Sequence, residues 1–183
     1  MKNLSLKEEG YLQGLFDGDG YVIYDKKSRH YQVDFYLNSE KDKDIIKFLL
    51  LLLKKKELNA QIYQDKRCHC KRIRIYSKIF FNEVSKGNEF KFNQKDFSLG
   101  YISSIIDSEG NINLKKSFIS IVNTDIEIIK RCKKILSLFG IKSAIKLRKK
   151  SFKDRLNSYR LYISVKFKRL PHLSIKVGRF LQT

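Results

Sequence analysis

One eleven-residue pattern occurs twice in this chain of 183 residues, with the copies ninety positions apart. Residues 10–20 read GYLQGLFDGDG, and residues 100–110 read GYISSIIDSEG. The Gly-Tyr pair, the first aspartate and the final glycine are identical, and most other positions keep their chemistry. Two copies at this separation indicate a tandem duplication, so both halves of the chain are expected to form the same structural unit.

Each unit is expected to contain the same series of helices and strands. The repeated pattern is helical, and the sequences Ser5-x-x-Glu8 and Asn93-x-x-Asp96 are expected to begin its two copies. Alternating apolar and polar residues predict strands, as in residues 31–38. In the first unit the expected elements after the first helix are strands at 21–24 and 31–38, a helix at 41–56, strands at 60–64 and 71–76, and a helix at 78–86. In the second they are strands at 111–114 and 118–123, a helix at 125–139, strands at 142–148 and 159–166, and a C-terminal helix. This order, αββαββα in residues 1–92 and again in 93–183, predicts an α+β protein of two pseudo-symmetric units.

Small residues recur at every fourth position of both copies. They are Gly10, Gly14 and Gly18 in the first, and Gly100, Ser104 and Ser108 in the second. Glycine inside a helix costs about 1 kcal/mol relative to alanine, so the stripe needs a structural reason. Small residues at this spacing allow two helix backbones to approach closely. We therefore expect the two helices to pack against each other, with Asp19 and Glu109 close together at their C-terminal ends.

Two acids at helix C-termini are unfavourable, because the carbonyl ends of helices carry partial negative charge. A divalent cation would remove this penalty, since hard cations bind carboxylate and carbonyl oxygens. The expected ligands are the side chains of Asp19 and Glu109, with Gly18 and Ser108 at the helix ends. The alternative is that Asp-Gly and Glu-Gly pairs simply terminate helices, an interpretation that two copies in one chain disfavour.

The chain carries 39 Lys and Arg against 19 Asp and Glu, which gives a net charge of +20. Both halves are basic, so the positive field belongs to the folded body and is expected to bind nucleic acid. The apolar run at 48–53 is too short to cross a membrane, and no membrane partner is expected. Three cysteines without framework spacing favour an intracellular, reducing compartment. The Lys- and Ile-rich composition fits an AT-rich genome, whether of an archaeon or an organelle.

The two motifs, LQGLFDGDG and ISSIIDSEG, resemble the LAGLIDADG motif of homing endonucleases in its single-chain, two-motif form. The resemblance implies a monomer that straddles double-stranded DNA with a saddle of two antiparallel sheets, with the motif helices at the interface. It implies an intron- or intein-type enzyme that hydrolyses both strands of a long DNA target and leaves short 3′ overhangs. Asp19 and Glu109 would each serve one strand with Mg²⁺, as two or more ions that Mn²⁺ or Ca²⁺ could replace in binding. Asp17 and Asp107 would be structural.

The resemblance also implies a polar residue near the attacking water, where the second strand of each unit ends. Asn38 and Asn123 occupy those positions, although either asparagine could instead cap the following helix. The lysine that assists catalysis in the family does not transfer cleanly. The best-matched stretch, residues 90–95, offers Asn93 flanked by Lys91 and Lys95, and the assignment stays open.

DNA readout is expected from the polar faces of the strands, since Arg pairs with guanine and Gln with adenine in the major groove. The candidates are Gln32, Asp34, Tyr36, Arg72, Arg74, Tyr76, Lys146, Arg148, Arg160 and Tyr162. For any one of them the alternative is an ordinary solvated sheet face.

Other interpretations differ in function or in site. A maturase of the same family would bind intron RNA without cutting, a catalytically silent protein would bind DNA alone, and a general metal nuclease would lack specificity. The sequence Cys68-His69-Cys70 could indicate zinc, but three neighbouring residues do not easily close a tetrahedral site, and a hairpin tip is expected instead.

Overall fold

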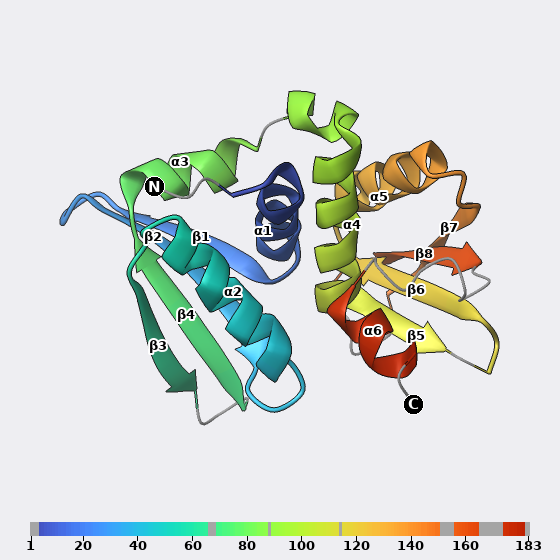
Figure 1. The fold of residues 1–183 in the computed structure, drawn as a ribbon, viewed down its shortest axis with the longest axis horizontal. Coiled ribbons are helices and arrows are strands. Elements are labelled where there is room, and N and C mark those ends of the chain that lie inside the picture. Colours follow the sequence, from blue (N-terminus) through green and yellow to red (C-terminus); the bar gives the residue numbers. More distant parts are fainter. Residues whose placement is uncertain are drawn as a thin grey trace.

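The computed structural model describes residues 4–65, 69–87, 89–113, 115–150, 156–164 and 174–181. Two similar halves lie side by side, each with one sheet and its own helices, and they meet along α1 and α4 (Figure 1). The first half contains α1 (Leu6–Asp19), β1 (Gly20–Asp25), β2 (His30–Asn38), α2 (Lys43–Lys55), β3 (Ala60–Asp65), β4 (Cys70–Tyr76) and α3 (Lys78–Lys86). After the 3-10 turn η1 (Glu89–Asn93), the second contains α4 (Lys95–Glu109), β5 (Gly110–Asn113), β6 (Phe118–Asn123), α5 (Ile126–Leu138), β7 (Ser143–Arg148), β8 (Ser158–Ser164) and α6 (Ile175–Leu181). The predicted αββαββα duplication is confirmed.

Both sheets are antiparallel and have equivalent strand orders, β1-β2-β4-β3 and β5-β6-β8-β7. Apolar residues on one face of each sheet pack against the helices and form a separate core in each half. On β2 these residues are Val33, Phe35 and Leu37, as the alternation predicts. The opposite face of each sheet carries the polar residues of the same strands.

The interface between the halves is made by the small residues of α1 and α4. A Cβ atom built on Gly10 would lie 2.0 Å from the carbonyl oxygen of Phe97, and one on Gly100 would lie 1.9 Å from that of Lys7. At Gly14 the corresponding distance to the carbonyl oxygen of Tyr101 is 2.5 Å. The backbones therefore touch at positions where no side chain fits, and the expected packing of the two stripes is confirmed.

The two motif helices begin differently. Ser5 and Glu8 form the predicted capping box, in which the Glu8 amide donates to Ser5 Oγ (3.3 Å) and the Ser5 amide donates to Glu8 Oε2 (2.9 Å). The prediction that Asn93 begins the second helix is wrong. Asn93 belongs to η1, and α4 starts after Gln94, whose side chain makes no capping hydrogen bond.

Most predicted elements lie within two residues of their observed bounds, and α3 and β6 agree at both ends. Leu114 and residues 165–166, which were expected to belong to strands, lie outside the described residues, as does Cys68. His69 lies in the turn between β3 and β4, in agreement with a hairpin tip at that point. None of the described helices is both long and apolar enough to cross a membrane.

We predict that Gly10→Ala lowers the free energy of unfolding by about 3 kcal/mol, because its methyl group would overlap the Phe97 carbonyl and push the helices apart. Gly178→Ala in α6 is the matched control, since a Cβ there meets no atom within 4 Å. The control should equal the wild type or gain up to about 1 kcal/mol from helix propensity. Urea denaturation measures both variants, and equal stability of Gly10→Ala and the wild type would contradict the packing.

Candidate active site

Asp19 and Glu109 are the last residues of the two packed helices. Each helix is closed by the following glycine, with the Gly20 amide donating to the Phe16 carbonyl and the Gly110 amide to the Ile106 carbonyl. Each helix is followed directly by the first strand of its sheet, β1 or β5. Because the helices touch along their whole small-residue stripe, the two carboxylates are brought to one end of the interface, half-buried between the sheets.

This position disfavours the ionised form of both acids. Burial raises the pKa of Asp19 to about 6, and the charge of Asp42 acts in the same direction. Burial raises the pKa of Glu109 to about 7, with a further contribution from the charge of Asp19. Lys176 lowers both pKa values but does not cancel the shifts. The structure thus concentrates negative charge that a cation would neutralise.

Asp17 and Asp107 have structural roles, as the sequence predicted. The Tyr101 hydroxyl donates to Asp17 Oδ2 (2.7 Å), and the Tyr11 hydroxyl donates to Asp107 Oδ2 (2.7 Å). The tyrosine of each motif is therefore bonded to the aspartate of the other across the interface. Gln13 and Arg131 also donate to Asp17, and the backbone amides of Ile175 and Lys176 donate to Asp107. Both aspartates therefore connect their helix to neighbouring parts of the fold.

The two candidate asparagines differ in position. Both asparagines accept backbone hydrogen bonds in the turn before the next helix, Asn38 Oδ1 from the amides of Glu40 and Lys41 and Asn123 Oδ1 from the amide of Asp125. The side-chain amide nitrogen of Asn123 also donates to Glu109 Oε1 (3.3 Å). The reason is strand register. The glycine that ends each motif helix pairs with Phe35 in the first sheet and with Ile121 in the second, so these two residues are equivalent. Two residues further along, Asn123 is therefore equivalent to Leu37. Asn38 is one residue later and points to the opposite face of its sheet. Asn123 contacts Glu109 and Asn38 does not, and the catalytic role of each asparagine stays a prediction.

The donor set fits a hard divalent cation in part. Asp19 and Glu109 offer carboxylate oxygens, and the described residues contain no cluster of three or more His, Cys, Asp and Glu that could hold a metal alone. The Ser108 carbonyl, an expected ligand, accepts a hydrogen bond from Lys176 Nζ (3.4 Å). The Gly18 Cα faces the Ser108 side chain, where a Cβ would lie 2.2 Å from its Oγ. The remaining ligands would have to be water or phosphate oxygens.

The predicted DNA contacts all lie on the sheet faces turned away from the helices. They come from β2, β4, β7 and β8. The expectation that Gln32 and Asp34 are exposed is wrong, because they are 8% and 0% exposed. Arg74 donates to both Asp34 oxygens (2.9 and 3.0 Å) and Gln32 donates to Oδ2 (2.8 Å), so Asp34 positions its neighbours.

Arg72 and Arg160 occupy equivalent positions on the two sheets. Arg72 pairs with Tyr36 and Arg160 with Val122, which the register makes equivalent residues. The Nε of each is buried, and within the described part of the chain no group accepts a hydrogen bond from it. A ligand with hydrogen-bond acceptors along its length, bound across both sheets, could accept hydrogen bonds from these two arginines.

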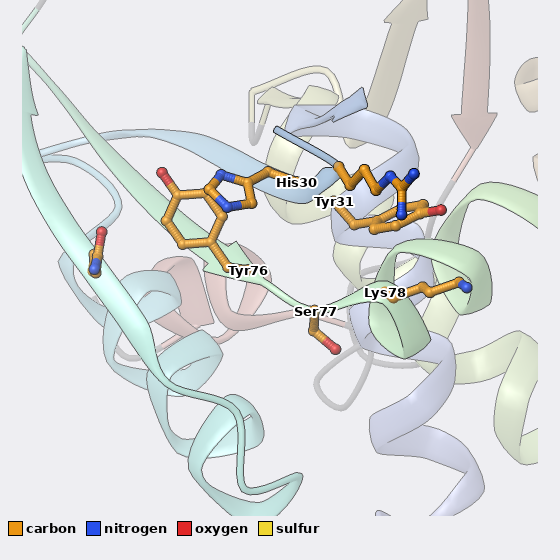
Figure 2. A pocket seen from close by; sticks show the side chains of 7 residues that line it. His30, Tyr31, Tyr76, Ser77 and Lys78 are labelled. Atoms are coloured by element: carbon orange, nitrogen blue, oxygen red, sulfur yellow. The ribbon is translucent and has the colours of Figure 1, made fainter. Parts of the chain in front are cut away.

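A hollow of about 550 Å³ lies at the end of the first sheet where β2 begins, β4 ends and α3 starts. Figure 2 shows the rings of His30 and Tyr76 together on one side and Tyr31 with Lys78 on the other. Arg29, Gln61 and Ser77 complete the lining, which contains no acid. Arg29 and Lys78 therefore add positive charge at this end of the first sheet, next to its aromatic residues.

The sequence profile of the LAGLIDADG-like domain matches this chain twice, over residues 7–84 and 96–170. The chain belongs to the LAGLIDADG family. Each match contains one motif helix and its sheet, in agreement with the duplication seen in the structure.

Similar proteins include structures and one curated sequence. I-DmoI in complex with DNA and Ca matches 97% of this chain and 98% of its own, with a TM-score of 0.75 and 19% identity. The N-terminal LAGLIDADG domain of DUF199/WhiA matches with a TM-score of 0.65 and 18% identity, over 100% of this chain and 89% of that one. The uncharacterized protein MJ0398 of Methanocaldococcus jannaschii is 28% identical over 148 residues, 78% of this chain and 52% of that protein. This chain therefore spans about half the length of that relative.

Two residues near the LAGLIDADG acids were missed from the sequence. Asp42 and Lys176 both act on Asp19, and neither lies in a LAGLIDADG motif. The stretch at 90–95 lies at the other end of the motif helices, where Lys91 Nζ pairs with Glu9 Oε2 (2.5 Å). Glu9 precedes Asp19 by ten residues, about 15 Å along the helix, so Lys91 is remote from the acids. No local pattern marks Lys176, because α6 brings it there through the tertiary fold.

We predict that the wild type loses stability as the pH rises. The pKa values of Asp19 and Glu109, about 6 and 7, lie above the ordinary values of 3.8 and 4.5. Between about pH 4 and 7 the folded protein keeps protons that the unfolded chain has lost, so this contribution to stability falls as the pH rises through the window.

In EDTA at pH 8, the free energy of unfolding of the double variant Asp19→Asn/Glu109→Gln should therefore be about 2 kcal/mol higher than that of the wild type, after allowance for solvent screening. At pH 4 the two free energies should be equal. Glu57→Gln, which replaces an exposed acid after α2, should follow the wild type at both values. Denaturant titrations at the two pH values measure the difference. A difference that does not change with pH would contradict the assigned ionisation.

Proposed function

We propose that this protein is a site-specific double-strand DNA endonuclease of the homing type, which acts as a monomer with divalent metal and leaves short 3′ overhangs. The observation that carries the proposal is the convergence of Asp19 and Glu109 at the abutting ends of two pseudo-symmetric helices. An intron or intein is the proposed genetic setting.

The positions of the two acids support the roles proposed for them. Each carboxylate belongs to one half of the molecule and ends the helix that leads into that half's sheet. Each can therefore serve the DNA strand bound by its own half, with Asn123 orienting Glu109 through its amide. A divalent cation bound there would supply activation of water and stabilisation of the leaving oxygen, with Mg²⁺ proposed and Mn²⁺ or Ca²⁺ able to take its place in binding.

The sheet faces and the charge support DNA as the substrate. The net charge is +20, and the uncovered faces carry Arg72, Arg160 and the predicted contact residues around them. The homing endonuclease I-DmoI, which shares the fold, has been solved in complex with DNA and Ca and in complex with DNA and Mn. We propose the same kind of ligand here.

We expect Asp19→Asn and Glu109→Gln each to reduce cleavage of one DNA strand by at least about a thousandfold, because each removes a carboxylate from the reacting end of one half. DNA affinity should change by less than about threefold, since few direct contacts are lost. The substrate is a target isolated from a plasmid library with randomised inserts, and the nicked and linear products are separated on gels. Glu57→Gln should cut like the wild type.

Full double-strand cleavage by both acid variants would overturn the assignment. Tight DNA binding without cleavage by the wild type would indicate a silent binding protein. Preferential binding of structured intron RNA, also without cleavage, would indicate a maturase.

We also expect the hollow beside α3 to contact phosphates at one end of the target. Arg29→Ala and Lys78→Ala should each weaken DNA binding at low salt and lower the slope of log affinity against log salt by about 1. Lys133→Met, an exposed lysine on α5, is the control for the change in net charge. Fluorescence anisotropy at several salt concentrations measures the slope. Identical slopes for all proteins would show that the hollow lies outside the DNA contact.

A further inference from the structure

Helix α6 lies at the foot of α4, next to the ends that carry the acids (Figure 1). Its counterpart α3 lies along the upper part of α1, where Val84 accepts a hydrogen bond from Gln13 (3.3 Å). The two helices therefore break the pseudo-symmetry of the halves. The end with the acids has α6 of the second half beside it, and the start of α2 is close enough for Asp42 to act on Asp19.

The position of α6 is fixed by contacts to both halves. Asp107 accepts hydrogen bonds from the backbone amides of Ile175 (3.1 Å) and Lys176 (2.8 Å). Val177 is fully buried in the second core, whereas Ile175 packs against the first. Arg179 donates to Asp44 (3.1 Å) and to the Lys41 carbonyl (2.7 Å), in the segment that begins α2. The helix thus spans the interface and holds both halves at the acidic end.

This anchoring directs the side chain of Lys176 to the site. Its Nζ donates to the Ser108 carbonyl (3.4 Å), one residue before Glu109. The same ammonium group lowers the pKa of Asp19 and of Glu109, so its field reaches both carboxylates. The ammonium is held by α6 at the point where the two helix ends concentrate negative charge.

We propose that Lys176 is the resident counter-cation of the Asp19–Glu109 pair, so that a divalent ion binds this site in competition with the ammonium group. The inference rests on the proposed function, because it assumes that these acids are metal ligands. The positive charge of the ammonium group repels a divalent ion that enters the site. When no divalent ion is bound, the same charge compensates the two carboxylates. Lys176 thereby lowers the affinity of the site for metal, and the anchored helix α6 holds the lysine in place.

The test is Mn²⁺ binding by the full chain without DNA, measured at pH 8 from the electron paramagnetic resonance signal of free Mn²⁺. Lys176→Met should bind Mn²⁺ about tenfold more tightly than the wild type, the effect of one unit charge in a partly screened site. Lys176→Arg, which keeps the charge, should stay within about twofold of the wild type. Lys133→Met, with the same change in net charge on an exposed part of α5, should match the wild type. The anchor of α6 is retained in every variant, because the backbone amide of residue 176 makes the bond to Asp107.

A second readout separates charge from structure. In EDTA, Lys176→Met should melt at a lower temperature than the wild type, and saturating Mn²⁺ should remove the difference. A Kd for Lys176→Met equal to that of Lys133→Met, or weaker than that of the wild type, would overturn the inference and leave the proposed function standing. Absence of Mn²⁺ binding by the wild type and by Lys176→Met would overturn the proposed metal site together with the inference.

Discussion

The contact of two helix backbones through Gly10, Gly14 and Gly100 is the constraint on which the rest of the structure depends. It fixes the distance between the halves, because no side chain fits between the helices at these positions. It also determines that the tyrosine of each motif reaches the aspartate of the other, which locks the rotation of one half against its partner. With distance and rotation fixed, Asp19 and Glu109 are brought to one end of the interface.

Bringing two acids together there opposes the stability of the fold, since burial raises both pKa values, helped by the charge of Asp42 at Asp19 and by that of Asp19 at Glu109. The chain tolerates this cost at the end where α6 supplies Lys176. An arrangement that is locally unfavourable and held by favourable packing elsewhere is typical of functional sites. The two sheets lie on either side of the motif helices that carry these acids (Figure 1).

The duplication, the order of elements and the paired acids could be predicted from the sequence, because each depends on local patterns or on repetition. The small-residue stripes were enough to place Asp19 beside Glu109. Three features depend on tertiary structure and could not be predicted. A one-residue difference in register separates Asn38 from Asn123, a bidentate bond from Arg74 buries Asp34, and the path of α6 brings Lys176 to acids more than sixty residues away in sequence. Asn93 was misassigned because η1 tightens the chain just before α4.

We propose that this acidic helix interface cuts DNA at a defined site. The most direct test incubates the purified protein with a plasmid library of randomised inserts, in Mg²⁺ or in EDTA, and sequences the ends. We expect cuts in Mg²⁺ alone, within one long recurrent sequence, with the two strands offset to leave short 3′ overhangs. Equal cutting in EDTA, or ends scattered without a common sequence, would contradict it.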